Sequence, residues 1–473
     1  MRWAGGFMSQ QVLDYIAKNK NHFLESLKQI IRLESISAQP AKKDQVLKCA
    51  DLETKILKEI GLENVQLIPT GGYPLVYGDW LHAPGKPTIL IYGHYDVQPP
   101  EPLDLWKTPP FEPTIVGDNL YARGSSDNKG QHFSHICAME AYLKTVGKLP
   151  VNIKVVLEGE EEVGGGGIDK YVREHGKFLA CDAVMISDTD WFDSERPAIS
   201  YSLKGLCYFE INVTGPSHDL HSGLYGGMVR NPLQSLSWIL SKLKNEKEEI
   251  LIPGFYDDVK PIAPDERKDI AALPFDANKV AEGAGASQLI SEGTFSPVET
   301  NWCRPTLDIC GMWGGYEGVG SKTIIPSKAG AKVSIRLVAN QDPKKIEKLF
   351  VNYVKSLSVD GVKVEVHTHS SGIPFHVERE NFFVQKTAKA YETALGKKMV
   401  FKRLGASIPI AAVFQSVLKV PVVLIGLGLP DDRVHSPNEK MSLPNFFDGI
   451  KGAALAYEAF AEYEFPPSPR GRG

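Results

Sequence analysis

TILIYGHYDVQ, residues 88–98, is the stretch on which the fold prediction depends. Its apolar run Ile89–Ile91 lies between prolines, which predicts a short buried strand in the centre of a parallel sheet. His94 and Asp96 follow as soon as the apolar run ends. Because ligands of open α/β sheets bind just beyond the carboxyl ends of the strands, this stretch predicts a functional site as well as a strand.

His94 and Asp96 have two interpretations. A neutral imidazole is the commonest metal ligand, and its second nitrogen needs a partner that fixes the tautomer. Asp96 lies two residues further along an extended chain, on the same side as His94, and can be that partner. An isolated H-x-D pair is more often a capped strand end with a satisfied histidine, so the residues that follow have to decide.

The composition is that of a soluble globular protein. A chain of 473 residues is too long for one ordinary core, so we expect two domains. Hydrophobic residues make up 42% and charged residues 23%, and the net charge of −4 indicates neither nucleic acid nor an anionic membrane as partner. No apolar run reaches the ~18 to 20 residues that a membrane span requires.

Cysteine usage and the N-terminal residues predict a cytoplasmic protein. The six cysteines are scattered without a C-x-x-C pair, which is typical of reduced thiols in a reducing compartment. The start MRWAGGFMSQ has no apolar signal core. We interpret residues 1–8 as an upstream extension before a start at Met8, and we expect the tail 465–473 to be disordered.

Two stretches of the chain alternate helices with short apolar strands. In the first we expect helices at 12–33, 45–60 and 131–146 and strands at 152–157 and 182–186. In the second we expect a helix at 382–395, a strand at 420–427 and a helix at 445–463. This pattern predicts an α/β catalytic domain with a mainly parallel sheet flanked by helices, built from residues 9–199 and 375–464.

Residues 200–374 follow a different pattern. Strands at 209–213 and 331–338 alternate apolar and polar residues, and helices are expected at 232–243 and 343–357. Residues 250–320 are rich in Pro, Gly and Asp and are expected to be largely irregular. We therefore predict a smaller α+β domain inserted into the catalytic domain.

Polar residues follow several of the predicted strands. Asp127 lies just before a helix, where a carboxylate is also common as a simple helix-start residue. EGEEEVGGGG, residues 158–167, places four glutamates in five positions, which repel one another unless cations neutralise some of them. A solvated acidic loop is the alternative. Asp188 ends the strand at 182–186, and His435 lies just beyond the late strand.

Together these residues form a candidate metal site. Two imidazoles with several carboxylates and no thiolate suit zinc or manganese. Two metals ~3.5 to 4 Å apart need a bridging carboxylate, and one spare carboxylate can then act as a base. The candidate residues are His94, Asp96, Asp127, Glu161, Glu162, Asp188 and His435.

Six motifs make a family resemblance specific. GHYDVQP, YARGSSDNKG, EGEEEVG, ISD, DLHSG and HSPNE occur in this order along nearly the whole chain. They resemble the dinuclear zinc metallopeptidase family that includes carboxypeptidase G, aminoacylase and succinyl-diaminopimelate desuccinylase. Within it, the carnosinase-type branch of cytosolic nonspecific dipeptidases is the most similar.

The resemblance implies a role for each candidate ligand. His94 and Asp188 would hold one divalent metal, Glu162 and His435 would hold the other, and Asp127 would bridge both. It also implies a cis peptide bond after Asp127. Asp rather than Glu at position 188 is similar to the dipeptidase side of the family. Among the remaining candidates, the resemblance implies that Asp96 orients a ligand and that Glu161 is the general base.

The inserted domain would serve as a lid and for dimerisation. His221 resembles a histidine supplied to the active site of the neighbouring subunit, although alone it is more typical of a loop histidine with a local hydrogen bond. Thr323, Arg336 and Ser407 match substrate-contact positions. Independently, Arg336 lies off the apolar face of its strand, where its guanidinium could bind a carboxylate or merely be an exposed edge-strand group.

The chain departs from the family pattern at two places. Glu160 stands where the family often has Met or Thr, and Gly165 stands where it often has Ser. The effect of the extra carboxylate at position 160 is open. Leu404 and Ala406 replace an acidic residue and a glycine of close relatives, which leaves the fine shape of the substrate pocket open.

The resulting prediction is an enzyme that hydrolyses dipeptides and other short peptides. A hydroxide shared by two zinc or manganese ions would attack, with Glu161 as base, in a homodimer in which His221 acts in trans. A deacylase of N-acyl amino acids with the same metals is the first alternative. An inactive scaffold protein is the second, but it would be expected to lack a ligand or the base, and none is missing.

Overall fold

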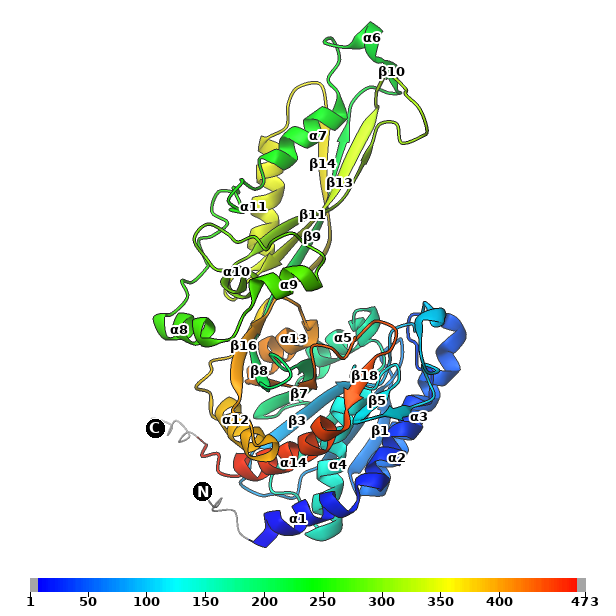
Figure 1. Ribbon diagram of the computed structural model, residues 1–473, viewed down its shortest axis with the longest axis vertical. Helices are drawn as coiled ribbons and strands as arrows, with labels where there is room; N and C mark the ends of the chain where they lie inside the picture. The colour runs from blue at the N-terminus through cyan, green and yellow to red at the C-terminus, as the bar shows by residue number, and fades with distance from the viewer. Residues whose placement is uncertain (1–6, 466–473) are drawn as a thin grey trace, which may run out of the picture. The chain divides into compact units, whose positions relative to one another are not determined.

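The computed structural model describes residues 7–465, and the expectations for residues 1–6 and 466–473 lie outside this range. The chain divides into two compact units (Figure 1). The first contains the described residues up to Tyr201, Val377–Lys402 and the described residues from Ile410 onward. The second contains Ser202–His376 and Arg403–Pro409.

The first unit is built on a large mixed sheet in the strand order β1-β2-β6-β3-β7-β17-β8. Its central neighbours β6, β3, β7 and β17 run parallel, whereas β1, β2 and β8 pair antiparallel. The strands span β1 (Glu63–Ile68), β2 (Leu75–Trp80), β3 (Thr88–His94), β6 (Asn152–Glu158), β7 (Ala183–Asp190), β8 (Ala198–Leu203) and β17 (Val422–Gly428). A small antiparallel sheet contains β4 (Thr114–Val116), β5 (Asn119–Tyr121) and β18 (Lys440–Ser442).

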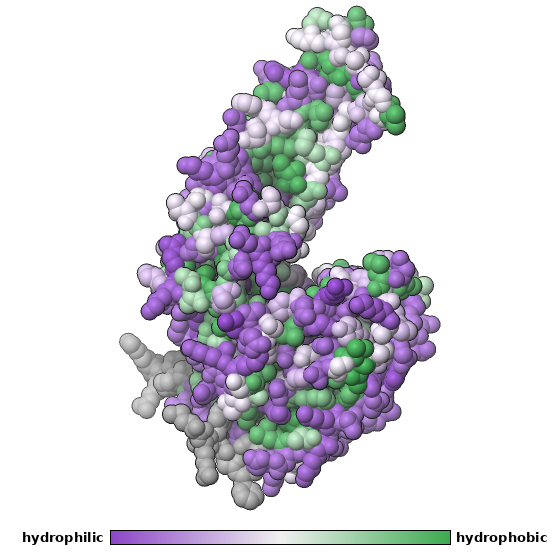
Figure 2. Space-filling model, viewed as in Figure 1, coloured by the Kyte–Doolittle hydropathy of each residue, from purple (hydrophilic) through white to green (hydrophobic). Residues whose placement is uncertain are grey.

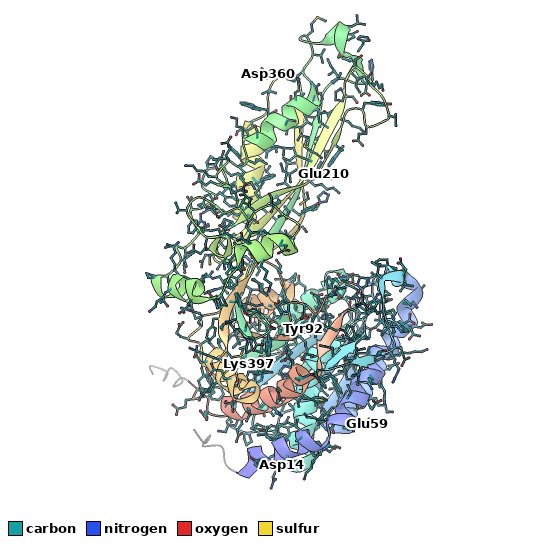
Figure 3. The ribbon with its side chains drawn as sticks, viewed as in Figure 1. Asp14, Glu59, Tyr92, Glu210, Asp360 and Lys397 are labelled. Carbon is teal, nitrogen blue, oxygen red and sulfur yellow. The ribbon has the colours of Figure 1, made fainter. Side chains whose placement is uncertain are left out.

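Helices cover both faces of the large sheet. They are α1 (Phe7–Lys18), α2 (Lys20–Ile31), α3 (Lys43–Ile60), α4 (Lys129–Thr145), α5 (Gly166–His175), α12 (Phe382–Leu395), α13 (Pro409–Leu418) and α14 (Leu443–Phe460). Two successive residues of β3 show the two layers. The Tyr92 ring, labelled in Figure 3, packs edge-on against Phe414 of α13, with the ring centroids 5.6 Å apart. A side chain at Gly93 would collide with His132 of α4, so this strand and helix pack closely on the opposite face.

The parallel strands position the candidate site. Residues of β3 and β6 pair from Thr88 and Asn152 up to His94 and Glu158, so these two strands end at the same edge. β7 runs parallel beside β3 and carries Asp188 close to its own end. The strand predicted from the apolar run is therefore confirmed as a buried central strand, and the fold class is confirmed as mixed α/β with a mainly parallel core.

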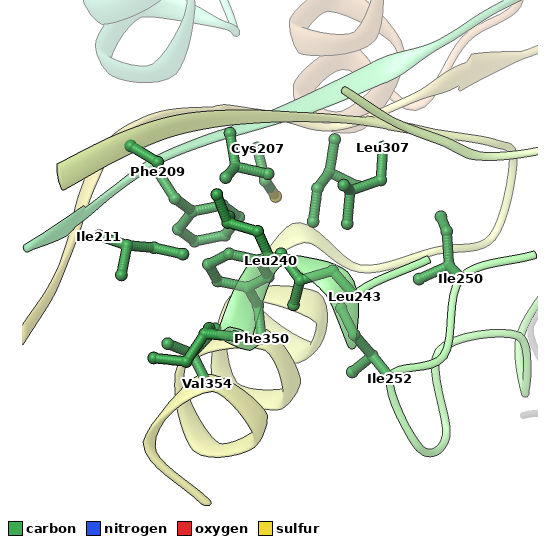
Figure 4. Packing of buried hydrophobic residues seen from close by; sticks show 14 of the residues in the cluster. Cys207, Phe209, Ile211, Leu240, Leu243, Ile250, Ile252, Leu307, Phe350 and Val354 are labelled. Atoms are coloured by element: carbon green, nitrogen blue, oxygen red, sulfur yellow. The ribbon is translucent and has the colours of Figure 1, made fainter. Parts of the chain in front are cut away.

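The second unit is an antiparallel sheet in the order β11-β13-β9-β14, with α7 and α11 packed on one face (Figure 4). Alternate residues of β9 point into this core, where the Phe209 and Phe350 rings stack with centroids 4.1 Å apart. The elements are β9 (Gly205–Thr214), β10 (Leu220–His221), α6 (Ser222–Tyr225), α7 (Pro232–Ser241), α8 (Pro264–Ala272), α9 (Ala277–Gly283), α10 (Pro297–Cys303), β11 (Thr306–Gly314), β12 (Ile324–Ile325), β13 (Lys328–Leu337), α11 (Pro343–Ser356), β14 (Lys363–Gly372) and β15 (Phe375–His376). The short strand β16 (Val400–Leu404) contributes residues to both units.

One prediction about the elements is wrong, and another is incomplete. The single helix expected at 12–33 is two helices with a turn at Asn19, because a continuous apolar spacing does not reveal a change of axis. The segment 250–320 is irregular over more than half of its residues, as expected, but it also holds α8, α9, α10 and β11, which the sequence did not predict. β11 is a sheet edge in which Leu307 is the single buried residue, so its sequence lacks the apolar alternation that identified β9 and β13.

The surface agrees with the composition. Hydrophilic residues predominate on the face shown in Figure 2. Among the described residues, no helix combines the length and apolar character needed to cross a membrane. All six cysteines lie in the described range and are free thiols, as the scattered spacing predicted.

Candidate metal centre

His94 lies at the end of β3 and is completely buried. Its Nδ1 is 3.1 Å from the backbone oxygen of Asp96 and 3.4 Å from the Asp96 carboxylate. Its Nε2 is 3.1 Å from Oδ1 of Asp127 and 3.9 Å from Oδ1 of Asp188. One ring nitrogen therefore has an orienting partner and the other points at two carboxylates, which is the arrangement of a metal-ligating imidazole.

Asp127 is placed between two histidines. Its Oδ1 faces His94, and its Oδ2 is 2.9 Å from Nε2 of His435. The same nitrogen of His435 is 3.3 Å from Oε2 of Glu162. Each oxygen of one carboxylate thus belongs to a different cluster of ligand atoms.

Two groups of ligand atoms meet at this carboxylate. In each group the atoms lie within 4.8 Å of one another, close enough to surround a single ion. The groups are His94, Asp127 and Asp188, and Asp127, Glu162 and His435. The structure therefore brings together all five residues predicted as metal ligands, from segments that are far apart in the sequence.

Neighbouring side chains hold these ligands in place. The Asn128 side chain donates to Oδ1 of Asp188 at 2.8 Å and accepts from the backbone N–H of His94 at 3.3 Å. Gln98 donates to Oε2 of Glu162 at 2.9 Å. The peptide bond between Asp127 and Asn128 is cis, as the resemblance implied.

The charges within the centre suit a divalent cation. Hydrogen bonds that His435 donates to the carboxylates of Asp127 and Glu162 raise its pKa to about 10. Burial lowers the pKa of His94, but its contacts with Asp127, Asp188 and Asp96 outweigh this and hold that pKa well above its usual value. The carboxylates thus favour a positive charge at both imidazoles, and a bound cation would supply this charge in place of a proton. With two imidazoles and three carboxylates, the residues fit a pair of zinc or manganese ions.

Glu161 lies in the turn that follows β6, next to the ligand Glu162. Burial raises the pKa of Glu161 to about 8, the charges of Asp188, Glu162 and Asp127 add to the rise, and His94 opposes it. Such a carboxyl group can take up and release a proton near neutral pH, as a general base requires.

Glu160, the extra carboxylate of this loop, contacts a different part of the chain. Its carboxylate occupies the space that a side chain at Gly72 would fill, and it lies beside Gly167. Burial raises its pKa, and a hydrogen bond from the backbone of Tyr73 opposes the rise. Neither group of ligand atoms includes Glu160.

The other four predicted residues, Arg336, Ser407, His221 and Thr323, lie in the second unit. Arg336 donates from Nη1 to the Ser407 hydroxyl at 3.2 Å. β13, which carries Arg336, is an interior strand, so the alternative of an exposed edge-strand arginine is wrong. His221 pairs with Ile324 across β10 and β12, directly after Thr323, and its Nδ1 accepts from the backbone N–H of Gly223 at 3.0 Å.

Two further residues support the site without being candidate ligands, and neither was predicted from the sequence. Asn128 donates to Asp188, and Glu439 accepts from the backbone N–H of Asp127. Both stand inside quoted motifs, Asn128 in YARGSSDNKG and Glu439 in HSPNE. Their position inside a motif was the available signal. The candidate ligands were chosen among histidines and carboxylates at strand ends and helix starts, whereas Asn128 carries an amide and Glu439 lies further beyond the late strand than His435.

The comparisons with known proteins agree on one family. The model of "Peptidase family M20/M25/M40" matches residues 90–459. The Cys-Gly metallodipeptidase of Schizosaccharomyces pombe is 34% identical over 461 residues, which cover 93% of this chain and 96% of the relative. The human Beta-Ala-His dipeptidase is 31% identical over 472 residues, 96% of this chain and 93% of the relative. A solved M20 family metallo-carboxypeptidase from Sulfolobus solfataricus superposes with a TM-score of 0.82 at 31% identity, covering 93% of this chain and 99% of that one.

Proposed function

Because the chain belongs to peptidase family M20/M25/M40, we propose that it is a metal-dependent dipeptidase. The observation that carries this proposal is the Asp127 carboxylate, whose two oxygens each face one histidine. Curated relatives over nearly the full length are named as a Cys-Gly metallodipeptidase and a Beta-Ala-His dipeptidase, which supports dipeptides as the substrate class.

We assign the five ligands to two zinc or manganese ions. One ion would be held by His94 and Asp188 and the other by Glu162 and His435, with Asp127 shared. When bound, such a pair supplies an acidified water and polarises a carbonyl group. Free cysteines throughout the described range support a reducing compartment such as the cytoplasm.

The chain's own groups move the protons and position the substrate. The Glu161 carboxylate takes a proton from the attacking water and passes it to the nitrogen of the leaving amine. Asp96 keeps the His94 ring in one tautomer through Nδ1. Arg336, held by Ser407, binds the free carboxylate of the peptide through its planar guanidinium group.

The position of His221 supports a homodimer. Within the second unit, His221 lies beyond the Lys328 end of β13, whereas Arg336 lies near the other end (Figure 1). Along β13 the distance from Lys328 to Arg336 is eight residues, or roughly 26 Å, whereas a dipeptide is at most about 7 Å long. One subunit therefore cannot offer both groups to the same dipeptide. We propose that His221 serves the active site of a second copy, where it stabilises the developing oxyanion and Thr323 contacts the substrate.

Metal removal with a panel of substrates tests the function. The purified protein should bind two ions per chain and hydrolyse Cys-Gly and β-Ala-His, lose this activity on chelation, and regain it with Zn²⁺ or Mn²⁺. Tripeptides and N-acetyl amino acids in the same panel separate a dipeptidase from a carboxypeptidase and from a deacylase. Faster turnover of N-acetyl amino acids than of every dipeptide would overturn the proposal.

A further inference from the structure

A second carboxylate supports the metal centre without being one of its proposed ligands. Glu439 is completely buried, and its two oxygens receive four N–H groups from the segment that ends at Asp127. Oε1 accepts from the backbone N–H of Ser126 and of Asp127, both at 3.0 Å. Oε2 accepts from Nη1 of Arg123 at 2.6 Å and from the backbone N–H of Gly124 at 3.1 Å.

The turn that carries Glu439 also carries His435. Asp127 is therefore held by one turn at two points, through its backbone N–H by Glu439 and through its Oδ2 by His435. In addition, the backbone oxygen of Glu439 accepts from the N–H of Ala122 at 3.1 Å. The turn is thus fixed to the segment 122–127 at several points, up to and including Asp127 itself.

We propose that Glu439 is a positioning residue that sets the place of the shared ligand Asp127 relative to His435, and so sets the affinity for the metal pair. This inference rests on the proposed function, because it assumes that Asp127 and His435 bind metal. Side chains that hydrogen-bond to metal ligands and fix their positions typically contribute 10- to 100-fold to metal affinity or activity.

The chemistry of the site explains why a neutral substitute would fail. A carboxylate offers about four acceptor sites, and at Glu439 all four meet an N–H donor. In Glu439→Gln the amide nitrogen would face two N–H groups in either orientation, either those of Ser126 and Asp127 or those of Arg123 and Gly124. The segment would then have to shift, and Asp127 would shift with it.

The experiment compares Glu439→Gln with Glu140→Gln. Glu140 is a second nearly buried carboxylate of the same unit, and it accepts from Tyr15 at 2.9 Å and contacts His22 at 3.0 Å. Both variants remove one buried charge, but only Glu439 contacts the metal ligands. Each purified protein is stripped with chelator, its unfolding temperature is measured, and it is titrated separately with Zn²⁺ and with Mn²⁺. The readouts are the dissociation constants, the number of ions bound and the rise in unfolding temperature on metal binding.

We expect the dissociation constant of at least one ion to be 10- to 100-fold larger in Glu439→Gln than in the unchanged protein. The rise in unfolding temperature on metal binding should also be smaller. Glu140→Gln should bind metal like the unchanged protein even if its metal-free form is destabilised. Unchanged metal affinity in folded Glu439→Gln overturns the inference. If that variant does not fold, Glu439→Asp, which keeps the charge on a shorter side chain, is measured in its place with the same two outcomes. If the unchanged protein binds fewer than two ions, the proposed function itself fails, which is a distinguishable result.

Discussion

The residues predicted to bind metal and those predicted to bind substrate are held in different ways. In the first unit, His94 and Asp127 are each fixed by several partners, and His94 is completely buried. In the second unit, His221 is exposed, and its ring accepts from a backbone N–H only two residues away. The metal centre is thus assembled within one chain, whereas His221 is presented at a surface.

Under the proposed homodimer, this difference separates the residues that need a second copy from those that do not. A centre with its own buried network can bind metal in an isolated subunit. In the proposed homodimer, the exposed His221 gains its catalytic role only when the second copy covers it. Metal binding and turnover should therefore respond differently to substitutions, and the predictions below separate them.

The largest effect is expected for Asp127→Asn. The amide keeps the shape but offers only one oxygen to the two histidines, so the shared position between the ions is lost. We expect turnover at background level and fewer than two ions bound, measured by elemental analysis and dipeptide hydrolysis. Asp182→Asn is the control, because this carboxylate accepts from the Thr88 N–H at 2.7 Å, at the end of β3 opposite His94. Two tightly bound ions in Asp127→Asn would contradict the bridging role.

The metal centre could be predicted from the sequence because a simple rule of topology applies to it. Parallel strands end at one edge of a sheet, so His94 and Asp188, each at or near the end of an apolar strand, had to lie close together. Asn128 and Glu439 escaped this rule because they support the site through hydrogen bonds to residues that are distant in the sequence, and those contacts depend on the folded path of the chain.

The strands and contacts of the second unit were harder to predict from the sequence, for a related reason. The alternation that identified β9 and β13 comes from one face packed on a core, and the exposed edge strand β11 lacks it. Arg336 was placed correctly off the apolar face, yet nothing in its own strand named Ser407 as its partner. The roles of His221 and Thr323 came from the resemblance alone, and they stay predictions.

The next largest effect is expected for Glu161→Gln. An amide cannot accept the proton of the attacking water, so turnover should fall about 10²- to 10⁴-fold while both ions remain bound. Elemental analysis and hydrolysis of Cys-Gly measure the two quantities on the same sample. Glu160→Gln, the same change one residue earlier and outside both ligand groups, is the matched control. Normal turnover by Glu161→Gln would exclude it as the base.

His221→Ala tests the contribution of the second copy. Loss of an oxyanion donor typically reduces turnover by 10²- to 10³-fold, and both metals should stay bound because His221 belongs to neither ligand group. If the histidine acts in trans, subunits carrying His221→Ala mixed with subunits carrying Glu161→Gln should regain activity, because one of the two sites in a mixed dimer has all its groups. Activity after unfolding and joint refolding measures this. No recovery despite demonstrated mixed dimers would place His221 in its own subunit's site.

A smaller effect is expected for Arg336→Lys. Lysine keeps the charge but loses the planar fork that can bind both oxygens of a carboxylate, and it cannot keep the same geometry toward Ser407. We expect kcat/KM for dipeptides to fall roughly tenfold, which corresponds to about 1.4 kcal/mol, mostly through KM. Dipeptide amides, which lack the carboxylate, should be affected much less. Arg230→Lys provides the control, since this arginine is exposed and donates to the backbone oxygen of Asp360. An equal loss for acids and amides would refute carboxylate binding by Arg336.

The smallest effect is expected where the chain departs from its family. Because the Glu160 carboxylate lies against Gly72 and Gly167 rather than in a ligand group, Glu160→Met should change kcat by less than about fivefold and leave both ions bound. Its main consequence should be a lower unfolding temperature, because the backbone N–H of Tyr73 loses an acceptor. Glu160→Gln keeps an acceptor oxygen and should retain most of the stability. A tenfold loss of turnover or a changed metal affinity in both Glu160→Met and Glu160→Gln would instead show that this negative charge tunes the metal centre from the neighbouring position.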